Sequence, residues 1–144
     1  MDNSEKISED IVQLVRVFLI MRCRDSEGPR PPLLDPQYWI LGFLKHGDLT
    51  MSELGNRLHR SKPNMTSIIN GLIAEGKVRR LPDKSDRRIV RITITEAGKK
   101  FLSDNGKSIK ESIKKNISTL NGDETAELRQ SLERVSRIIS KLSW

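Results

Sequence analysis

Residues 50–98, TMSELGNRLHRSKPNMTSIINGLIAEGKVRRLPDKSDRRIVRITITEAG, decide the fold of this chain. Thr50 begins a predicted helix with a capping-box spacing to Glu53, in which the hydroxyl and the carboxylate satisfy backbone donors reciprocally. A turn is expected at residues 59–60, and a second helix over residues 62–75. Two short helices joined by a tight turn are typical of a helix-turn-helix.

The second predicted helix carries a face of small, uncharged polar groups. At 100° per residue its apolar side chains gather on one side and Pro63, Ser67 and Asn70 lie opposite. An ordinary exposed face is rich in Glu and Lys, whereas Asn pairs with adenine and Ser or Thr with several bases. The alternative is a helix that happens to be polar but uncharged. Ser61 is placed to cap the helix and Pro63 falls in its first turn. The predicted major-groove residues are Ser61, Lys62, Pro63, Asn64, Thr66, Ser67 and Asn70.

Residues 77–94 read as a two-stranded ribbon with a basic tip. Val90, Ile92 and Ile94 alternate with polar residues, as a half-buried strand requires. The ribbon is too small to be stable alone and must pack on the helices, so its tip projects like a wing toward a minor groove. The predicted wing contacts are Lys84, Ser85, Arg87, Arg88 and Arg91, and Asp86 is expected to pair with Arg87 or Arg88 and hold the wing in shape.

The positive charge of the chain is concentrated in one block. The net charge is +7, and residues 77–115 hold 13 Lys or Arg against 5 Asp or Glu. A localised basic excess indicates a polyanionic partner, because each neutralised phosphate releases counterions. For residues 99–115 a solvated charged helix face is the competing interpretation. The low apolar fraction of 35% also suggests that surface is buried between chains.

The two ends of the chain are predicted to be helical. Residues 7–21 are apolar almost all round, so this helix must be covered in a dimer interface or in the chain's own core. A second apolar seam runs from Phe101 to Leu120, a break follows at residues 121–123, and a last helix carries apolar residues at spacings of three and four up to Leu142. Such seams favour helix packing between protomers. The expected fold is mainly α, a winged helix-turn-helix with a small β-wing plus N- and C-terminal dimerisation helices.

Between these parts lies a Pro-rich loop over residues 25–36, then a helix over residues 38–45 that Gly47 is expected to cap. The aromatic residues of this helix are most simply core, but they could also line a small-molecule pocket. That candidate pocket comprises Arg16, Arg22, Tyr38 and Trp39, with an arginine as counter-ion for an aromatic acid.

Several other functions are disfavoured by the sequence. One cysteine, Cys23, rules out an internal disulfide framework and fits a reducing cytoplasm. Neighbouring arginines could activate its thiol, so a redox role for Cys23 stays open beside an inert structural one. No signal peptide, membrane span, metal spacing, cofactor motif or nucleophile–base pair is evident. We therefore expect a cytoplasmic protein that is not an enzyme and needs no metal or cofactor.

The motifs together resemble the multiple antibiotic resistance regulator (MarR) family. The resemblance covers roughly residues 36–105, and the wing segment Asp83-Lys-Ser-Asp-Arg-Arg88 with the later Thr95-Glu-Ala-Gly98 is its most specific part. It implies a single domain over residues 1–144, with dimerisation helices at 1–34 and 100–144 and the winged helix-turn-helix at 36–98. Lys84 and Arg60 depart from the residues usual at their positions.

The resemblance implies a homodimer that binds a pseudo-palindromic operator in double-stranded DNA. It also implies a repressor that a small lipophilic or phenolic effector relieves, with Arg88 as the minor-groove residue. The alternatives are a winged-helix module that binds protein or binds DNA without sequence preference, and a regulator that responds to redox through Cys23. Membrane association is not expected.

Overall fold

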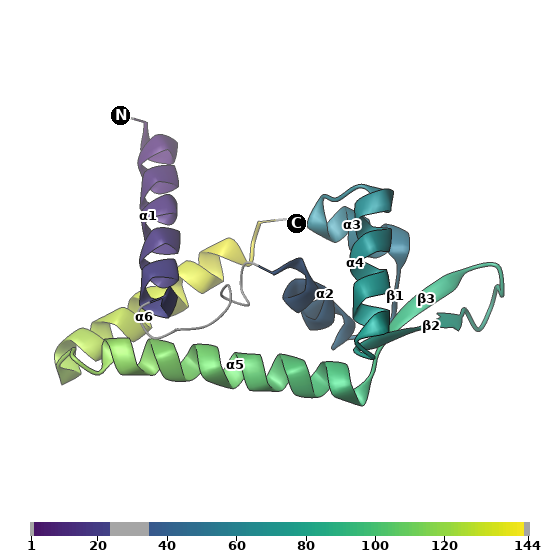
Figure 1. Ribbon diagram of the computed structural model, residues 1–144. Coiled ribbons are helices and arrows are strands. Elements are labelled where there is room, and N and C mark those ends of the chain that lie inside the picture. Colours follow the sequence, from purple (N-terminus) through teal and green to yellow (C-terminus); the bar gives the residue numbers. More distant parts are fainter. Residues whose placement is uncertain (1, 24–34, 143–144) are drawn as a thin grey trace. The chain divides into compact units, whose positions relative to one another are not determined.

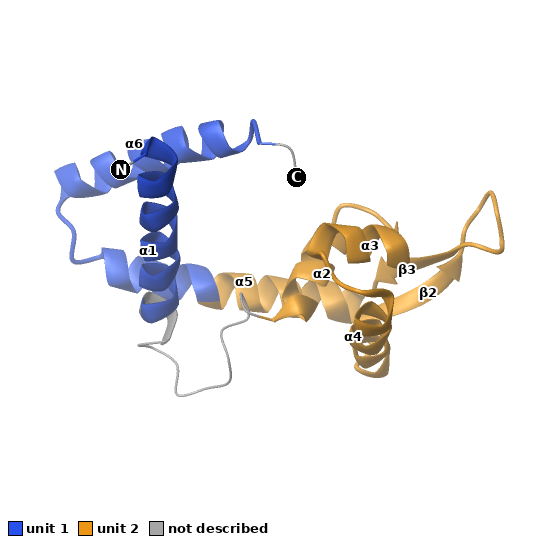
Figure 2. Ribbon diagram, turned by 90° about the horizontal axis from the view of Figure 1, so that it is seen from above, with its two compact units in different colours: residues 1–27, 109–144 blue, residues 28–108 orange. Residues whose placement is uncertain are grey.

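The computed structural model describes residues 2–23 and 35–142, with side chains described at 2–20 and 35–142. In chain order the elements are α1 (Asn3–Cys23), α2 (Pro36–Leu44), β1 (Leu49–Thr50), α3 (Met51–Leu58), α4 (Lys62–Ala74), β2 (Val78–Pro82), β3 (Val90–Ile94), α5 (Glu96–Ile117) and α6 (Gly122–Ile139) (Figure 1). The chain divides into two compact units, residues 1–27 with 109–144, and residues 28–108 (Figure 2). This mainly helical fold with a small sheet confirms the expected fold class.

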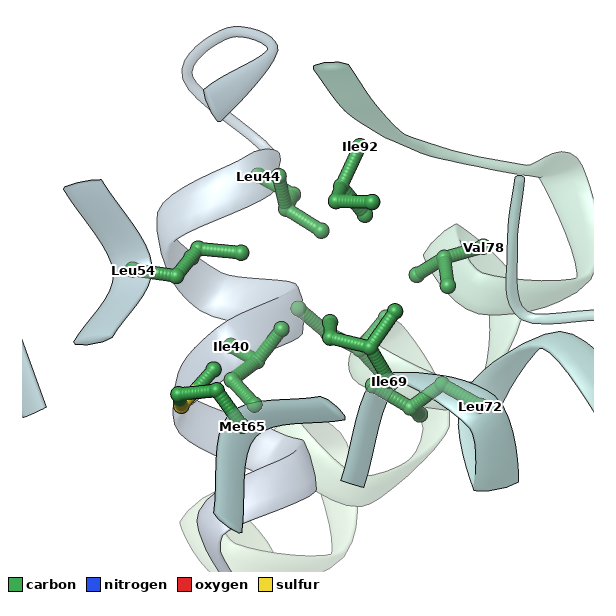
Figure 3. Close-up of a cluster of buried hydrophobic side chains, with 9 residues drawn as sticks. Ile40, Leu44, Leu54, Met65, Ile69, Leu72, Val78 and Ile92 are labelled. Carbon is green, nitrogen blue, oxygen red and sulfur yellow. The ribbon is translucent and has the colours of Figure 1, made fainter. Parts of the chain in front are cut away.

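The unit of residues 28–108 contains the hydrophobic core. Apolar side chains from α2, α3, α4, β2 and β3 converge on one cluster (Figure 3). Its buried members are Ile40, Leu41, Leu44, Leu54, Met65, Ile69, Leu72, Val78 and Ile92. Because α3, α4 and the sheet all contribute to this one cluster, the polar face of α4 and the wing are held by the same packing.

The sheet has three antiparallel strands in the order β1-β3-β2, which corrects the expectation of a two-stranded ribbon. Leu49 of β1 pairs with Ile92 of β3, and Val78 of β2 pairs with Ile94 on the other side. A strand of two residues is too short for an alternating pattern, so β1 could not be predicted from the sequence. Val90 is exposed at the far end of β3, where a half-buried side chain was expected.

Several element ends differ from the predicted ones. Pro36, placed in the loop, is the first residue of α2, and the Asp35 carboxylate accepts a bond from the Gln37 amide at 2.9 Å. The C-cap of α2 is Lys45 and not Gly47. Near the C-terminus α5 ends at Ile117, before the predicted Leu120.

The last helix starts at Gly122, within the break predicted at residues 121–123. Asn121 caps α6 in a capping box with Glu124, in which the Asn121 side chain accepts from the Glu124 amide at 2.9 Å. A helix that begins with glycine is easily missed from propensity alone, because the signal lies in the cap.

The apolar faces of the terminal helices are exposed in the single chain. On α6 no residue is buried, and on α1 the described apolar side chains are all exposed except Leu19, which is half-buried. Burial of the first helix in the chain's own core is therefore wrong for the described residues. The exposed residues are Ile7, Ile11, Val12, Leu14, Val15, Val17, Phe18 and Ile20 on α1, with Leu128, Leu132, Val135, Ile138 and Ile139 on α6.

Within the described residues, none of the helices is long and apolar enough to cross a bilayer. The same part of the chain holds no group of three or more His, Cys, Asp or Glu side chains that could bind a metal ion.

Candidate nucleic-acid interface

Helix α3, the first helix of the helix-turn-helix, is fixed at both of its ends. The predicted capping box is confirmed, since the Thr50 hydroxyl accepts from the Glu53 amide at 3.2 Å and the Glu53 carboxylate accepts from the Thr50 amide at 2.7 Å. His59 ends α3 in the left-handed conformation at φ 49°. The Arg60 amide then bonds back to the Gly55 carbonyl at 3.0 Å. This geometry fixes where α4 begins.

The polar face of α4 is exposed as predicted. Met65, Ile69 and Leu72 are fully buried on the inner side, so the opposite side is turned to solvent. The exposed predicted contacts on α4 and its cap are Ser61, Lys62, Pro63, Asn64, Ser67 and Asn70, and Thr66 is half-buried. The helix therefore presents an uncharged polar surface on a rigid support.

Two hydroxyl groups on this face behave differently. Ser61 occupies the N-cap position, but its side chain makes no capping hydrogen bond, so its hydroxyl is available to an incoming group. Thr66 donates its hydroxyl to the Lys62 carbonyl at 2.9 Å, which leaves it only as an acceptor. Pro63 lies in the first turn, as predicted.

Asn70 is bound to the adjacent strand. The Arg80 guanidinium of β2 donates through Nη2 to the Asn70 Oδ1 atom at 2.8 Å, and both side chains are exposed. Arg80 was not among the predicted contacts. A signal was present in the sequence, because Val78 faces the core and Arg80, two residues on, must share that face of the strand.

The wing tip between β2 and β3 is organised by two aspartates. Asp83 accepts through Oδ2 from the amides of Ser85 at 3.0 Å and Asp86 at 3.1 Å. Asp86 accepts through Oδ1 from the Arg88 amide at 3.0 Å and from its Nε at 3.2 Å. Of the two expected partners of Asp86, the structure therefore pairs it with Arg88. Asp83, which organises the wing tip, was not among the residues predicted from the sequence.

Arg91 lies at the base of the wing and points back to the helices. Its Nε donates to the Asp83 carboxylate, and its Nη1 donates to the Asp48 carbonyl at 3.2 Å and lies 3.9 Å from the Glu53 carboxylate. Arg91 thus joins the wing to the cap of α3. In contrast, Lys84 and Arg87 are exposed and form no ion pair within the part of the chain that the structure describes.

The network around Asp83 predicts a dependence of wing order on pH. The Arg91 guanidinium and the two tip amides hold the pKa of Asp83 below its ordinary value. Because the Asp83 carboxyl has a lower pKa in the folded wing than in the unfolded chain, its ionised form stabilises the folded wing at pH values above the unfolded pKa of about 3.9. This stabilisation is lost as the pH falls through the pKa of Asp83 in the folded protein. Asp83→Asn should therefore loosen the tip at neutral pH, seen as faster amide exchange at Ser85 and Asp86. Exchange at these amides that matches the wild type at pH 7 would contradict the assignment.

The candidate ligand residues come from different parts of the chain. Arg16 belongs to the unit of residues 1–27 and 109–144, whereas Tyr38 and Trp39 belong to the unit of residues 28–108. The rings of Tyr38 and Trp39 meet edge to face with centroids 6.2 Å apart. The side chains of Arg22 and Cys23 lie outside the described residues, so the pocket and redox hypotheses stay untested predictions.

Comparisons with known proteins agree with this geometry. A family model described as the MarR family matches residues 32–89. An uncharacterized HTH-type transcriptional regulator from Bacillus subtilis, YpoP, is 33% identical over 90 residues, which are 62% of this chain and 64% of that relative. This chain therefore matches less than two thirds of the length of YpoP. The curated relatives are transcriptional regulators, so the prediction of a non-enzyme is confirmed.

Solved structures share the fold. The apo form of wild-type MarR from E. coli superposes with a TM-score of 0.67 at 21% identity, covering 94% of this chain and 96% of that one. A MepR-like protein complexed with pseudoligands gives a TM-score of 0.52 at 28% identity, covering 96% and 95% of the two chains.

Proposed function

We propose that this chain, whose residues 32–89 match the MarR family model, is a sequence-specific DNA-binding homodimer that represses transcription in the cytoplasm. The observation that carries the proposal is the exposed, uncharged polar face of α4, held on a buried core beside an arginine-tipped wing. A helix of this kind enters a major groove, and an arginine on a projecting loop suits the narrow minor groove beside it.

The described side chains divide into two kinds of contact. Asn64, Ser67 and Asn70 are short and polar and can reach base edges, so they are assigned to sequence reading. Lys62, Lys84 and Arg87 are exposed cations and are assigned to phosphates, where they raise affinity for any duplex. Arg91 is assigned to positioning the wing, because its guanidinium binds Asp83 and the Asp48 carbonyl and its side chain is only 36% exposed, whereas the side chain of Arg88 is 91% exposed.

Dimerisation is proposed through the terminal helices. The apolar faces of these helices are exposed in a single chain, and packing against the same faces of a second copy would remove them from water. Two copies would set their α4 helices about 34–36 Å apart, in successive major grooves of a pseudo-palindromic operator. Occupancy of such a site in a promoter would then block transcription.

Relief by a small lipophilic or phenolic effector is a separate part of the proposal. It is supported by the MepR-like relative, which was solved in complex with pseudoligands. Lower operator affinity and a raised melting temperature in the presence of salicylate would support an effector site, and no change in either at millimolar salicylate would speak against phenolic effectors.

A protein-binding module is the main alternative from another class. It would need an exposed apolar patch on α4, whereas the exposed side chains on this helix include Asn64, Ser67 and Asn70. The observed surface therefore favours DNA.

Arg88→Ala tests the wing contact. Removing this guanidinium should lower operator affinity about tenfold and reduce the salt slope of binding by about 1, because one cationic contact to DNA is lost. The measurement is fluorescence anisotropy on a selected operator at two salt concentrations. Arg137→Ala on α6 removes the same charge outside the wing and serves as the control. Equal losses in both variants would mean that Arg88 acts only through net charge.

A further inference from the structure

Arg80 and Asn70 form a contact between strand β2 of the wing and helix α4. On β2, Val78 is buried in the core and Arg80 pairs in register with the buried Ile92 of β3. Side chains in register lie on the same face of a sheet, so Arg80 is on the face of the sheet that packs on α4. It extends past the edge of the core and reaches Asn70, with the Nη2 and Oδ1 atoms 2.8 Å apart.

This bond changes what Asn70 can recognise. Bidentate pairing of asparagine with adenine requires the amide oxygen to accept from the adenine amino group while the amide nitrogen donates to N7. The Arg80 guanidinium donates to that oxygen and occupies one of its two lone pairs, whereas no described hydrogen bond uses the N–H donors of the Asn70 amide. The guanidinium retains further N–H donors on the same exposed surface. The Arg80 guanidinium and the Asn70 amide therefore place N–H donors next to one another.

Resting on the proposed DNA-binding function, we propose that Arg80 and Asn70 form one specificity-determining unit that reads guanine in the major groove. Guanine is the base whose major-groove edge offers two acceptors, O6 and N7, and a guanidinium is the group that most often binds them. Arg80 thereby reads a base from the wing strand, and Asn70 holds the guanidinium in place.

The chain supplies a matched control for this inference. Arg79 is the preceding residue on β2, is also exposed, and lies on the opposite face of the strand because side chains alternate. Arg79→Ala and Arg80→Ala remove the same charge from neighbouring positions. Only Arg80→Ala removes the bond to Asn70, so a difference between the variants separates base reading from simple charge.

The test is selection of bound duplexes from a random pool by the full-length wild type and by Arg79→Ala, Arg80→Ala, Asn70→Ala and the Arg80→Ala/Asn70→Ala double variant. The wild type should enrich a guanine at one position of each half-site. Arg80→Ala and Asn70→Ala should each weaken that preference about tenfold at the same position, and the double variant should do no more than the stronger single one. Arg79→Ala should keep the wild-type preference. Melting curves verify that each variant is folded.

Two results would overturn the inference in different ways. If the wild type enriches an operator but Arg80→Ala and Arg79→Ala lose affinity equally for all sequences, Arg80 is a phosphate contact and the proposed function survives. If the wild type enriches nothing, sequence-specific binding itself fails and the inference fails with it.

Discussion

Gly98→Ala should destabilise the winged-helix unit by about 3 kcal/mol, one of the largest effects expected of a single methyl group in this chain. A Cβ atom at position 98 would lie 2.2 Å from the Lys77 carbonyl oxygen and 2.8 Å from Ile94 Cγ1. That carbonyl cannot easily move, because it accepts a hydrogen bond from the Thr95 amide at 3.0 Å. The first turn of α5 is thus pressed against the segment that joins α4 to β2.

The Thr95-x-x-Gly98 motif of the sequence has its physical explanation here. The Thr95 hydroxyl donates to the Gly76 carbonyl at 2.6 Å and accepts from the Gly98 amide at 3.1 Å, so it caps α5 and fastens it to the end of α4 at once. Only a residue without a side chain fits at position 98.

Urea unfolding followed by circular dichroism measures the effect, and Gly106→Ala is the matched control. Gly106 also lies on α5, but a Cβ atom there would be 3.8 Å from the nearest group, the Tyr38 hydroxyl, which is an ordinary contact. Replacing glycine by alanine within a helix should stabilise it by up to about 1 kcal/mol. Equal unfolding midpoints for Gly98→Ala and the wild type would refute the close approach at Lys77.

Leu132→Glu should convert the proposed dimer to a monomer and lower operator affinity by about 100-fold. Leu132 lies on the apolar face of α6 and is 44% exposed in the single chain, so the substitution leaves the fold of one protomer intact. In an apolar interface the carboxylate would lose its hydration without gaining a partner, at a cost of several kcal/mol. Two linked half-sites bind far more tightly than one, and that gain disappears with the dimer.

Sedimentation and operator titration measure the two parts of this prediction. Gln130→Glu adds the same negative charge on the opposite face of α6 and should keep both the dimer and the affinity. A Leu132→Glu variant that stays dimeric would place the interface elsewhere, and one that becomes monomeric without losing affinity would show that a single α4 is enough for binding.

Those parts of the fold and of the candidate site that depend on residues close together in the sequence could be predicted from the sequence. The capping box at Thr50 and Glu53 and the inner face of α4 follow local spacing, so the helix-turn-helix was predicted correctly. The three-residue spacing from Thr95 to Gly98 was visible as well. The reason for a glycine there was not visible, because the carbonyl that leaves no room for a Cβ atom belongs to Lys77, in the segment that joins α4 to β2.

The site was less predictable where partners are distant in the sequence. Arg91 was predicted as a DNA contact because it is a cation on the wing, yet its partners include Asp48 and Glu53, some 40 residues away. Arg80 was overlooked although its two-residue spacing from Val78 was visible, because its partner Asn70 lies on another element. Composition identifies where charge is concentrated, but only the fold determines which charges are already paired.

The most direct test of the account is selection of duplexes by the wild-type protein from a random pool, followed by titration of the enriched sequence at two salt concentrations. A sequence-reading homodimer predicts an inverted repeat whose half-sites are centred about 10 base pairs apart, together with a steep loss of affinity as salt rises. Failure to enrich any sequence, with weak salt-dependent binding to every duplex, would contradict it.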